Sequence, residues 1–377
     1  MHAVKHTRLE ELVAELDRQK KSKVDFVGDL RSMDVVRPDY NGLNLVPRHG
    51  HKYMNEFLDE GGINVPIKTL KQLGKRLDVD IPPAFLENLV LGQPDVARDL
   101  VGNLMAVTEK SVLVRMLDGN VRAVLSDRYR VMDNYDLAFS ALATVRENGG
   151  EILKSYLTDD RMEISFTTKE LWEKFNSVAK HGGGAHQFIE AIGKGEDGGG
   201  TGTDPTFNPV ITIGNSEVGR GGQFVRYGIL ARYCLNTMMI ETASVERHLG
   251  SRMESGILTQ ETLDADAKAL QLKVRDMIVA GFHPATFARI CKKVQGATET
   301  VIENPTTAVQ NVVEGNQLSE QAKDSILEYF LKDYDSTAYG LSAAVSRYAQ
   351  DVDADVGSDL EVLAGAILSS PKQYATA

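Results

Sequence analysis

The sequence predicts an α+β protein, in which a small mixed or antiparallel sheet built from hairpins with flanking helices lies between helical N-terminal and C-terminal regions. Apolar residues alternate with period two on both sides of the dipeptide Asp118-Gly119, as in a β-hairpin. A second alternating pair follows over residues 152–167. In the last third of the chain, apolar residues recur at intervals of three and four, which is typical of helices.

The length of 377 residues exceeds what one hydrophobic core usually serves, so we expect more than one domain. The patterns favour a helical and irregular region over 1–104, an α+β core domain over 105–255 and a helical region over 256–377. Glycine triplets at both ends of 181–205 predict a flexible loop there.

The totals exclude several classes of protein. Lys and Arg number 42 against 53 Asp and Glu, and the net charge of −11 disfavours indiscriminate attraction to nucleic acid or anionic lipid. Any polyanion site must therefore be local. No apolar run reaches the ~18 residues that a membrane span needs, and the first residues lack the apolar segment of a signal peptide. With only Cys234 and Cys291, the chain has no disulfide framework, and we expect a cytoplasmic protein without a membrane partner.

Each expected element has a local signal. In the N-terminal region, helical spacing is confined to short pieces, and Pro and Gly interrupt residues 38–62. After the first hairpin, Asp133 or Asn134 can cap a helix that stops near Gly149. Thr168 is expected to open another helix through Trp172, Phe175 and Val178. Strand patterns resume at Pro209–Ile213 and Gln223–Tyr233, and the last helices are expected at Leu263–Val279, Pro284–Val294, Ser319–Leu331, Gly340–Tyr348 and Leu360–Leu368.

Several of these segments carry a family resemblance. The string Asp118–Asn134 resembles the central signature of a phage- and plasmid-encoded family catalogued as domain of unknown function nine-three-two. Asn215–Gly219 with Tyr233–Asn236 is similar to the middle block of that family, and Tyr339–Ser346 with Leu360–Gly365 is similar to its helical end.

The resemblance covers roughly residues 105–370 and departs from the family at Thr237, where glycine is expected. It implies a setting in mobile elements, within the cytoplasm of a host cell, and a role in nucleic-acid transactions or host takeover. It offers no catalytic residues to carry over.

The arginines of the first hairpin are its most informative polar feature. A two-residue turn at Asp118-Gly119 places Arg115 opposite Arg122, and alternation then puts Arg115, Arg122, Arg128 and Arg130 on one face. Facing arginines repel unless an anion or a carboxylate lies between them. The face is therefore either a phosphate-binding surface or a solvated one that is neutralised by acids such as Asp127, Asp133 or Glu217.

A second arginine-bearing segment is the strand expected at Gln223–Tyr233. Alternation puts Phe224, Arg226, Leu230 and Arg232 on one face and Val225, Tyr227, Ile229 and Tyr233 on the other. Arginine interleaved with aromatic residues suits single-stranded nucleic acid, but the aromatics can equally be core. The glycine-rich segment Asn215–Gly222 can hold an anion beside Arg220, or can simply be a hairpin loop.

No catalytic, metal or cofactor motif emerges. His49 with His51, and His181 with His186, lack zinc-like partners, and the acidic run from Asp351 fails the register of a calcium loop. We therefore lean against an enzyme and expect a nucleic-acid-binding protein of phage or mobile-element origin that anneals or protects single-stranded DNA. The residues expected to bind are Arg115, Arg122, Arg128, Arg130, Arg220, Arg226 and Arg232.

Two alternatives stay open. The chain could be a phage-encoded interaction protein that binds and modulates a host protein, or an unrecognised enzyme whose residues converge only in space. An exposed sheet edge would also permit a homo-oligomer.

Overall fold

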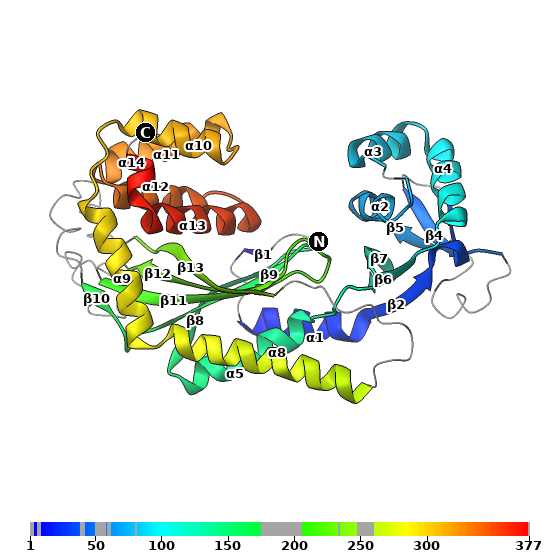
Figure 1. Ribbon diagram of the computed structural model, residues 1–377, viewed down its shortest axis with the longest axis horizontal. Coiled ribbons are helices and arrows are strands. Elements are labelled where there is room, and N and C mark those ends of the chain that lie inside the picture. Colours follow the sequence, from blue (N-terminus) through cyan, green and yellow to red (C-terminus); the bar gives the residue numbers. More distant parts are fainter. Residues whose placement is uncertain are drawn as a thin grey trace.

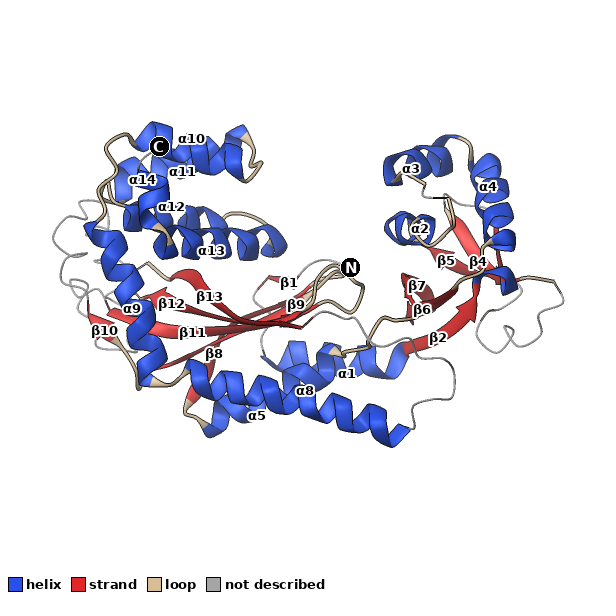
Figure 2. Ribbon diagram, viewed as in Figure 1, coloured by secondary structure: helices blue, strands red, loops and turns tan. Residues whose placement is uncertain are grey.

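The computed structural model describes residues 4–5, 9–37, 42–49, 58, 62–79, 81–174, 206–232, 234–246 and 260–375 (Figure 1). The predicted α+β class is confirmed, since this part of the chain forms antiparallel sheets flanked by helices (Figure 2). The elements gather into two lobes. The small lobe comprises the described residues between 23 and 126, and the large lobe comprises the other described residues.

The large lobe is organised around one antiparallel sheet of order β1-β8-β9-β11-β12-β13, with β10 pairing with β11. The predicted second hairpin is confirmed as β8 and β9. The alternation of faces predicted for the Gln223–Tyr233 strand is confirmed on β12, where the side chains of Val225, Tyr227 and Ile229 enter the main core. The strands are β1 (Val4–Lys5), β8 (Gly150–Leu157), β9 (Met162–Thr168), β10 (Glu173–Lys174), β11 (Thr206–Asn215), β12 (Gln223–Ala231) and β13 (Asn236–Glu246).

Helices cover the large sheet from two sides (Figure 1). On one side lie α1 (Leu9–Ser22), α5 (Asn134–Glu147) and α8 (Gln260–Gly281). The Tyr227 hydroxyl fixes α8 to the sheet by donating to the carbonyl of Met277 at 2.6 Å.

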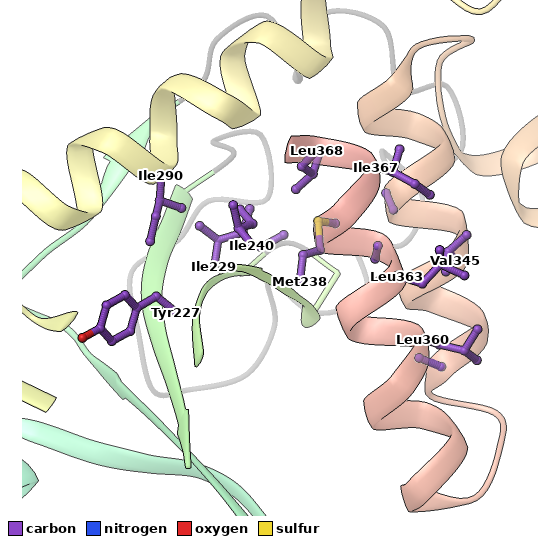
Figure 3. Close-up of a cluster of buried hydrophobic side chains, with 14 of the residues drawn as sticks. Tyr227, Ile229, Met238, Ile240, Ile290, Val345, Leu360, Leu363, Ile367 and Leu368 are labelled. Carbon is purple, nitrogen blue, oxygen red and sulfur yellow. The ribbon is translucent and has the colours of Figure 1, made fainter. Parts of the chain in front are cut away.

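The C-terminal helices lie on the other side, and α13 packs directly on β13. Figure 3 shows Leu363 and Ile367 of α13 near Val345 of α12 and Met238 of β13, so a continuous apolar core joins the sheet to this bundle. The helices are α9 (Pro284–Glu299), α10 (Pro305–Gly315), α11 (Glu320–Asp333), α12 (Ala338–Ala349), α13 (Ala354–Ser369) and α14 (Pro371–Ala375).

The small lobe holds the predicted first hairpin. Asp118 and Gly119 have φ values of 53° and 72°, as the mirror-image turns of tight hairpins require. The hairpin extends into a sheet of order β2-β6-β7, and a second sheet has the order β3-β4-β5. The elements are β2 (Lys23–Asp29), β3 (Met33–Val36), β4 (Leu43–Pro47), β5 (Ile63–Val65), α2 (Ile67–Gly74), α3 (Pro83–Gly92), α4 (Pro94–Val107), β6 (Ser111–Leu117) and β7 (Asn120–Ser126).

The structure corrects two local expectations. The N-terminal region is not only helical and irregular, because β2 to β5 are strands. The helix expected from Thr168 through Val178 is absent over residues 168–174, where Glu173–Lys174 forms β10 instead, and its remaining residues lie outside the described part of the chain. The glycine-rich loop over 181–205 lies outside the described residues. None of the described helices is long and apolar enough to span a bilayer.

An ion pair between β13 and α9 gives the fold a testable pH dependence. Glu241 accepts a hydrogen bond from Arg289 at 2.7 Å and lies 2.9 Å from Lys293. The Arg289 bond, with help from Lys293 and against partial burial, lowers the pKa of Glu241 to about 2. A carboxyl group whose pKa is lower in the folded state stabilises above its unfolded pKa and stops doing so as the pH falls through the folded value.

We expect Glu241→Gln to lower the free energy of unfolding by about 0.5–1 kcal/mol at pH 7, since solvent screens the pair. The difference should shrink below about pH 4 and vanish near pH 2. Urea unfolding at several pH values checks this expectation, and a difference that stayed constant with pH would contradict it.

Candidate nucleic-acid interface

Arg115 is not on an outward surface, which corrects the expectation for the first hairpin. Its side chain is 0% exposed and donates through Nε to Asp25 at 2.9 Å, through Nη2 to Asp133 at 3.0 Å and through Nη1 to the carbonyl of Glu217 at 2.9 Å. Burial would lower the pKa of Arg115, but the charges of Asp25 and Asp133 outweigh it and raise that pKa. The guanidinium is fully engaged.

Arg122 is likewise held by an acid within the protein. Its Nη2 pairs with the carboxylate of Glu217, which is itself buried. Burial and the nearby charge of Arg115 lower the pKa of Arg122 to about 10. The expected outward face, with Arg115 opposite Arg122, is therefore wrong, and the alternative of neutralisation by Asp133 and Glu217 describes these side chains, although they are buried rather than solvated.

The predicted and the observed surroundings of Arg115 and Arg122 differ for two structural reasons. A register shift between Arg115 and Met116 places Ala123, not Arg122, opposite Arg115. On the other side, β2 pairs with β6 and sets Asp25 directly opposite Arg115, so β6 is a central strand. The sequence pattern of the hairpin alone gave no sign of this third strand.

This buried cluster holds the two lobes together. The chain passes from the large to the small lobe at Lys23 and returns before Asp133, and the Nζ of Lys23 lies 2.5 Å from Asp133. The cations Lys23 and Arg115 lower the pKa of Asp133 although burial opposes them. Glu217 also accepts from the backbone N–H of Asn134 at 2.6 Å, which ties the β11–β12 loop to the start of α5.

Arg226 and Arg232 lie elsewhere on β12. Arg226 is half-buried beside the Phe224 ring, with its guanidinium carbon 3.8 Å from the ring centroid, and burial lowers its pKa. Arg232 is exposed at the far end of the strand. The structure therefore does not bring these two arginines to the cations of the first hairpin.

Three segments beside the buried cluster do bring exposed cations together. The Gln72 side chain of α2 donates to the carbonyl of Val218 at 2.8 Å and accepts from the backbone N–H of Val124 at 3.1 Å. The Tyr129 hydroxyl donates to the carbonyl of Ser216 at 2.8 Å. The end of α2, the turn after β7 and the β11–β12 loop are thus in contact with one another, and we call these three segments the junction rim.

The junction rim is locally basic. It carries the exposed Lys75, Arg128 and Arg220 and the half-buried Arg76 and Arg130. The acids beside them include Asp127, on the same turn as Arg128, and Asp160, whose carboxylate lies 3.6 Å from Arg220. Burial lowers the pKa of Arg76. On a chain of net charge −11, this is a local excess of cations.

Sequence reasoning found Arg128, Arg130 and Arg220 of the junction rim but missed Lys75 and Arg76. Both lie within residues 67–77, one of the short pieces with helical spacing in the N-terminal region, and exposed cations are ordinary on such a segment. Only the contact of α2 with the loop and the turn makes them part of a site, and no local signal could have shown that contact.

The segments that carry the family resemblance also meet in space. The Asn215 amide donates to the carbonyl of Met132 and to the Asn134 side chain, both at 2.8 Å, so the middle block is bonded to the central signature. In the C-terminal part, the Ser346 hydroxyl donates to the carbonyl of Thr237 at 2.9 Å. These hydrogen bonds join separate elements of the fold to one another.

In the described part of the chain, no group of three or more His, Cys, Asp or Glu side chains is arranged to hold a metal ion. Comparisons with family models, with curated proteins and with solved structures found no match for this chain. The resemblance to the mobile-element family thus stays a prediction.

Proposed function

We propose that this protein binds single-stranded nucleic acid through contacts of the junction rim with backbone phosphates. The observation that carries the proposal is that hydrogen bonds bring together three segments of an acidic chain that bear Lys75, Arg76, Arg128, Arg130 and Arg220. Phosphate contacts by Lys and Arg supply most of the affinity of sequence-independent binding.

A single strand suits this surface better than a duplex. The junction rim is formed by the end of a helix, a turn and a loop, and the flexible backbone of a single strand can follow such irregular segments. A duplex is stiff over about 150 base pairs and would have to meet the rim as a rigid rod. Handling of single strands, by annealing or protection, also fits the setting in mobile elements that the family resemblance implies.

Removal of two exposed cations tests the proposal. The double variant Arg128→Ala/Arg220→Ala should bind a fluorescein-labelled 30-nucleotide single strand about tenfold or more weakly, and the slope of log affinity against log salt should become shallower by about 1.4. Fluorescence anisotropy at several salt concentrations measures both quantities.

The matched control is Arg98→Ala/Lys292→Ala, which removes the same charge from half-exposed Arg98 of α4 and exposed Lys292 of α9. We expect the control to bind like the wild type. An equal loss of affinity in both variants would show that only the net charge matters. An unchanged affinity in the Arg128→Ala/Arg220→Ala variant would refute the proposed site.

A second candidate, binding to a protein partner, is favoured by the outer surface of the small lobe. Phe85, Leu91 and Val96 of the neighbouring helices α3 and α4 are 53%, 50% and 52% exposed, and large exposed apolar side chains are candidates for contact with a partner. Affinity capture with and without nuclease separates the two functions. A partner bound here should survive nuclease and be lost on Phe85→Ser/Leu91→Ser, whereas a partner bridged by nucleic acid should be lost on nuclease treatment.

A further inference from the structure

A groove lies between α5 and α8, on the side of the large lobe that faces away from the C-terminal helices (Figure 1). Its volume is about 490 Å³. Phe139 and Leu272 lie in it, each 38% exposed, although large apolar side chains are ordinarily withdrawn from water. An apolar centre with a charged rim is the usual anatomy of a protein interface.

The two walls of the groove carry opposite charges. The α5 wall presents the acids Asp136 and Glu147, and the α8 wall presents the bases Lys268 and Arg275. Each set recurs at helical spacing, so each forms a stripe along its own helix. Among the described residues, these charges make exposed pairs, such as Asp136 with Lys20 at 3.3 Å and Arg275 with Asp276 at 3.0 Å, and such surface pairs are weak enough to exchange.

We infer that this groove is the contact surface of a homodimer. A two-fold axis parallel to the groove sets α5 of each copy against α8 of the other. That operation brings the acidic stripe of one copy to the basic stripe of its partner twice, and it brings Phe139 to Leu272 in the centre. A surface with opposite charges on its two walls is complementary to itself under this symmetry, which is what an isologous dimer requires.

Two charge-reversed variants test the dimer. Asp136→Lys/Glu147→Lys makes both walls basic, and Lys268→Glu/Arg275→Glu makes both walls acidic. Each variant alone should place like charges opposite each other and raise the dimer dissociation constant by roughly a hundredfold relative to the wild type. An equimolar mixture should restore association, because a basic face then meets an acidic one. Sedimentation velocity over a range of protein concentrations measures all four samples.

The wild type should sediment as a dimer at tens of micromolar. Phe139→Ser, which leaves every charge in place, should also weaken the dimer, and this variant keeps the test informative if a charge reversal disturbs folding. A monomeric wild type, unaltered association of the variants, or a mixture that stays monomeric would each overturn the proposal. Circular dichroism confirms that each variant is folded.

Discussion

Replacing Arg115 with methionine should lower the free energy of unfolding by about 3–5 kcal/mol, because the loss of one member of a buried ion cluster leaves its partners uncompensated. Asp25 and Asp133 would lose their shared guanidinium, and the carbonyl of Glu217 would lose a donor. Methionine has similar length and would fill part of the space, so the effect reports the charge rather than a cavity. Urea unfolding of the variant against the wild type measures it.

The control for this prediction is Arg128→Met, the same substitution at an exposed position two residues after β7. It should change the free energy of unfolding by no more than about 0.5 kcal/mol. If Arg115→Met were as mild as the control, the cluster would not be what joins the small lobe to the large one.

The second large effect is expected at Gly365 of α13. A Cβ at this position would lie 1.8 Å from the carbonyl oxygen of Met239 and 2.2 Å from its carbon, and both are backbone atoms that cannot rotate away. Gly365→Ala must therefore push α13 off β13 and loosen the core shown in Figure 3. We expect a loss of about 3 kcal/mol, at the upper end of the usual range for overpacking.

Gly296 of α9 provides a matched control with the opposite sign. A Cβ there would meet nothing within 4 Å, and the residue lies inside a helix. Gly296→Ala should raise the free energy of unfolding by about 0.5–1 kcal/mol, since alanine loses less backbone entropy than glycine in a helix. Thermal unfolding shows whether each substitution raises or lowers the stability of the protein. A Gly365→Ala variant as stable as the wild type would contradict the close approach of α13 to β13.

Those elements of the fold were predictable whose sequence pattern lies within the element itself. The Asp118-Gly119 turn carries its own conformational requirement, and the alternation of apolar residues in β8, β9 and β12 is visible within each strand. β2 was not predictable in this way. Its sequence, Lys23-Val-Asp-Phe-Val-Gly-Asp29, has no turn next to it that brings it to a neighbour, and its partner β6 is far along the chain.

The contrast between local signals and contacts of distant segments also explains why the burial of Arg115 and Arg122 was not predicted. Alternation can say which residues of one strand share a face, but whether that face is covered depends on other segments. Asp25 comes from β2 and Glu217 from the β11–β12 loop, so the burial of Arg115 and Arg122 depends on contacts made across the whole fold. Arg128 and Arg220 stay exposed because no segment in the described part of the chain covers them.

The most direct test of the central claim is the salt dependence of binding by the wild-type protein. If three to five cations of the junction rim contact phosphates, the affinity for a 30-nucleotide single strand should fall by roughly 20- to 130-fold between 50 and 200 mM KCl. Binding of that strength and slope, stronger for the single strand than for the matching duplex, is the predicted result. Absence of binding at 50 mM KCl, or an affinity that does not change with salt, would contradict the account.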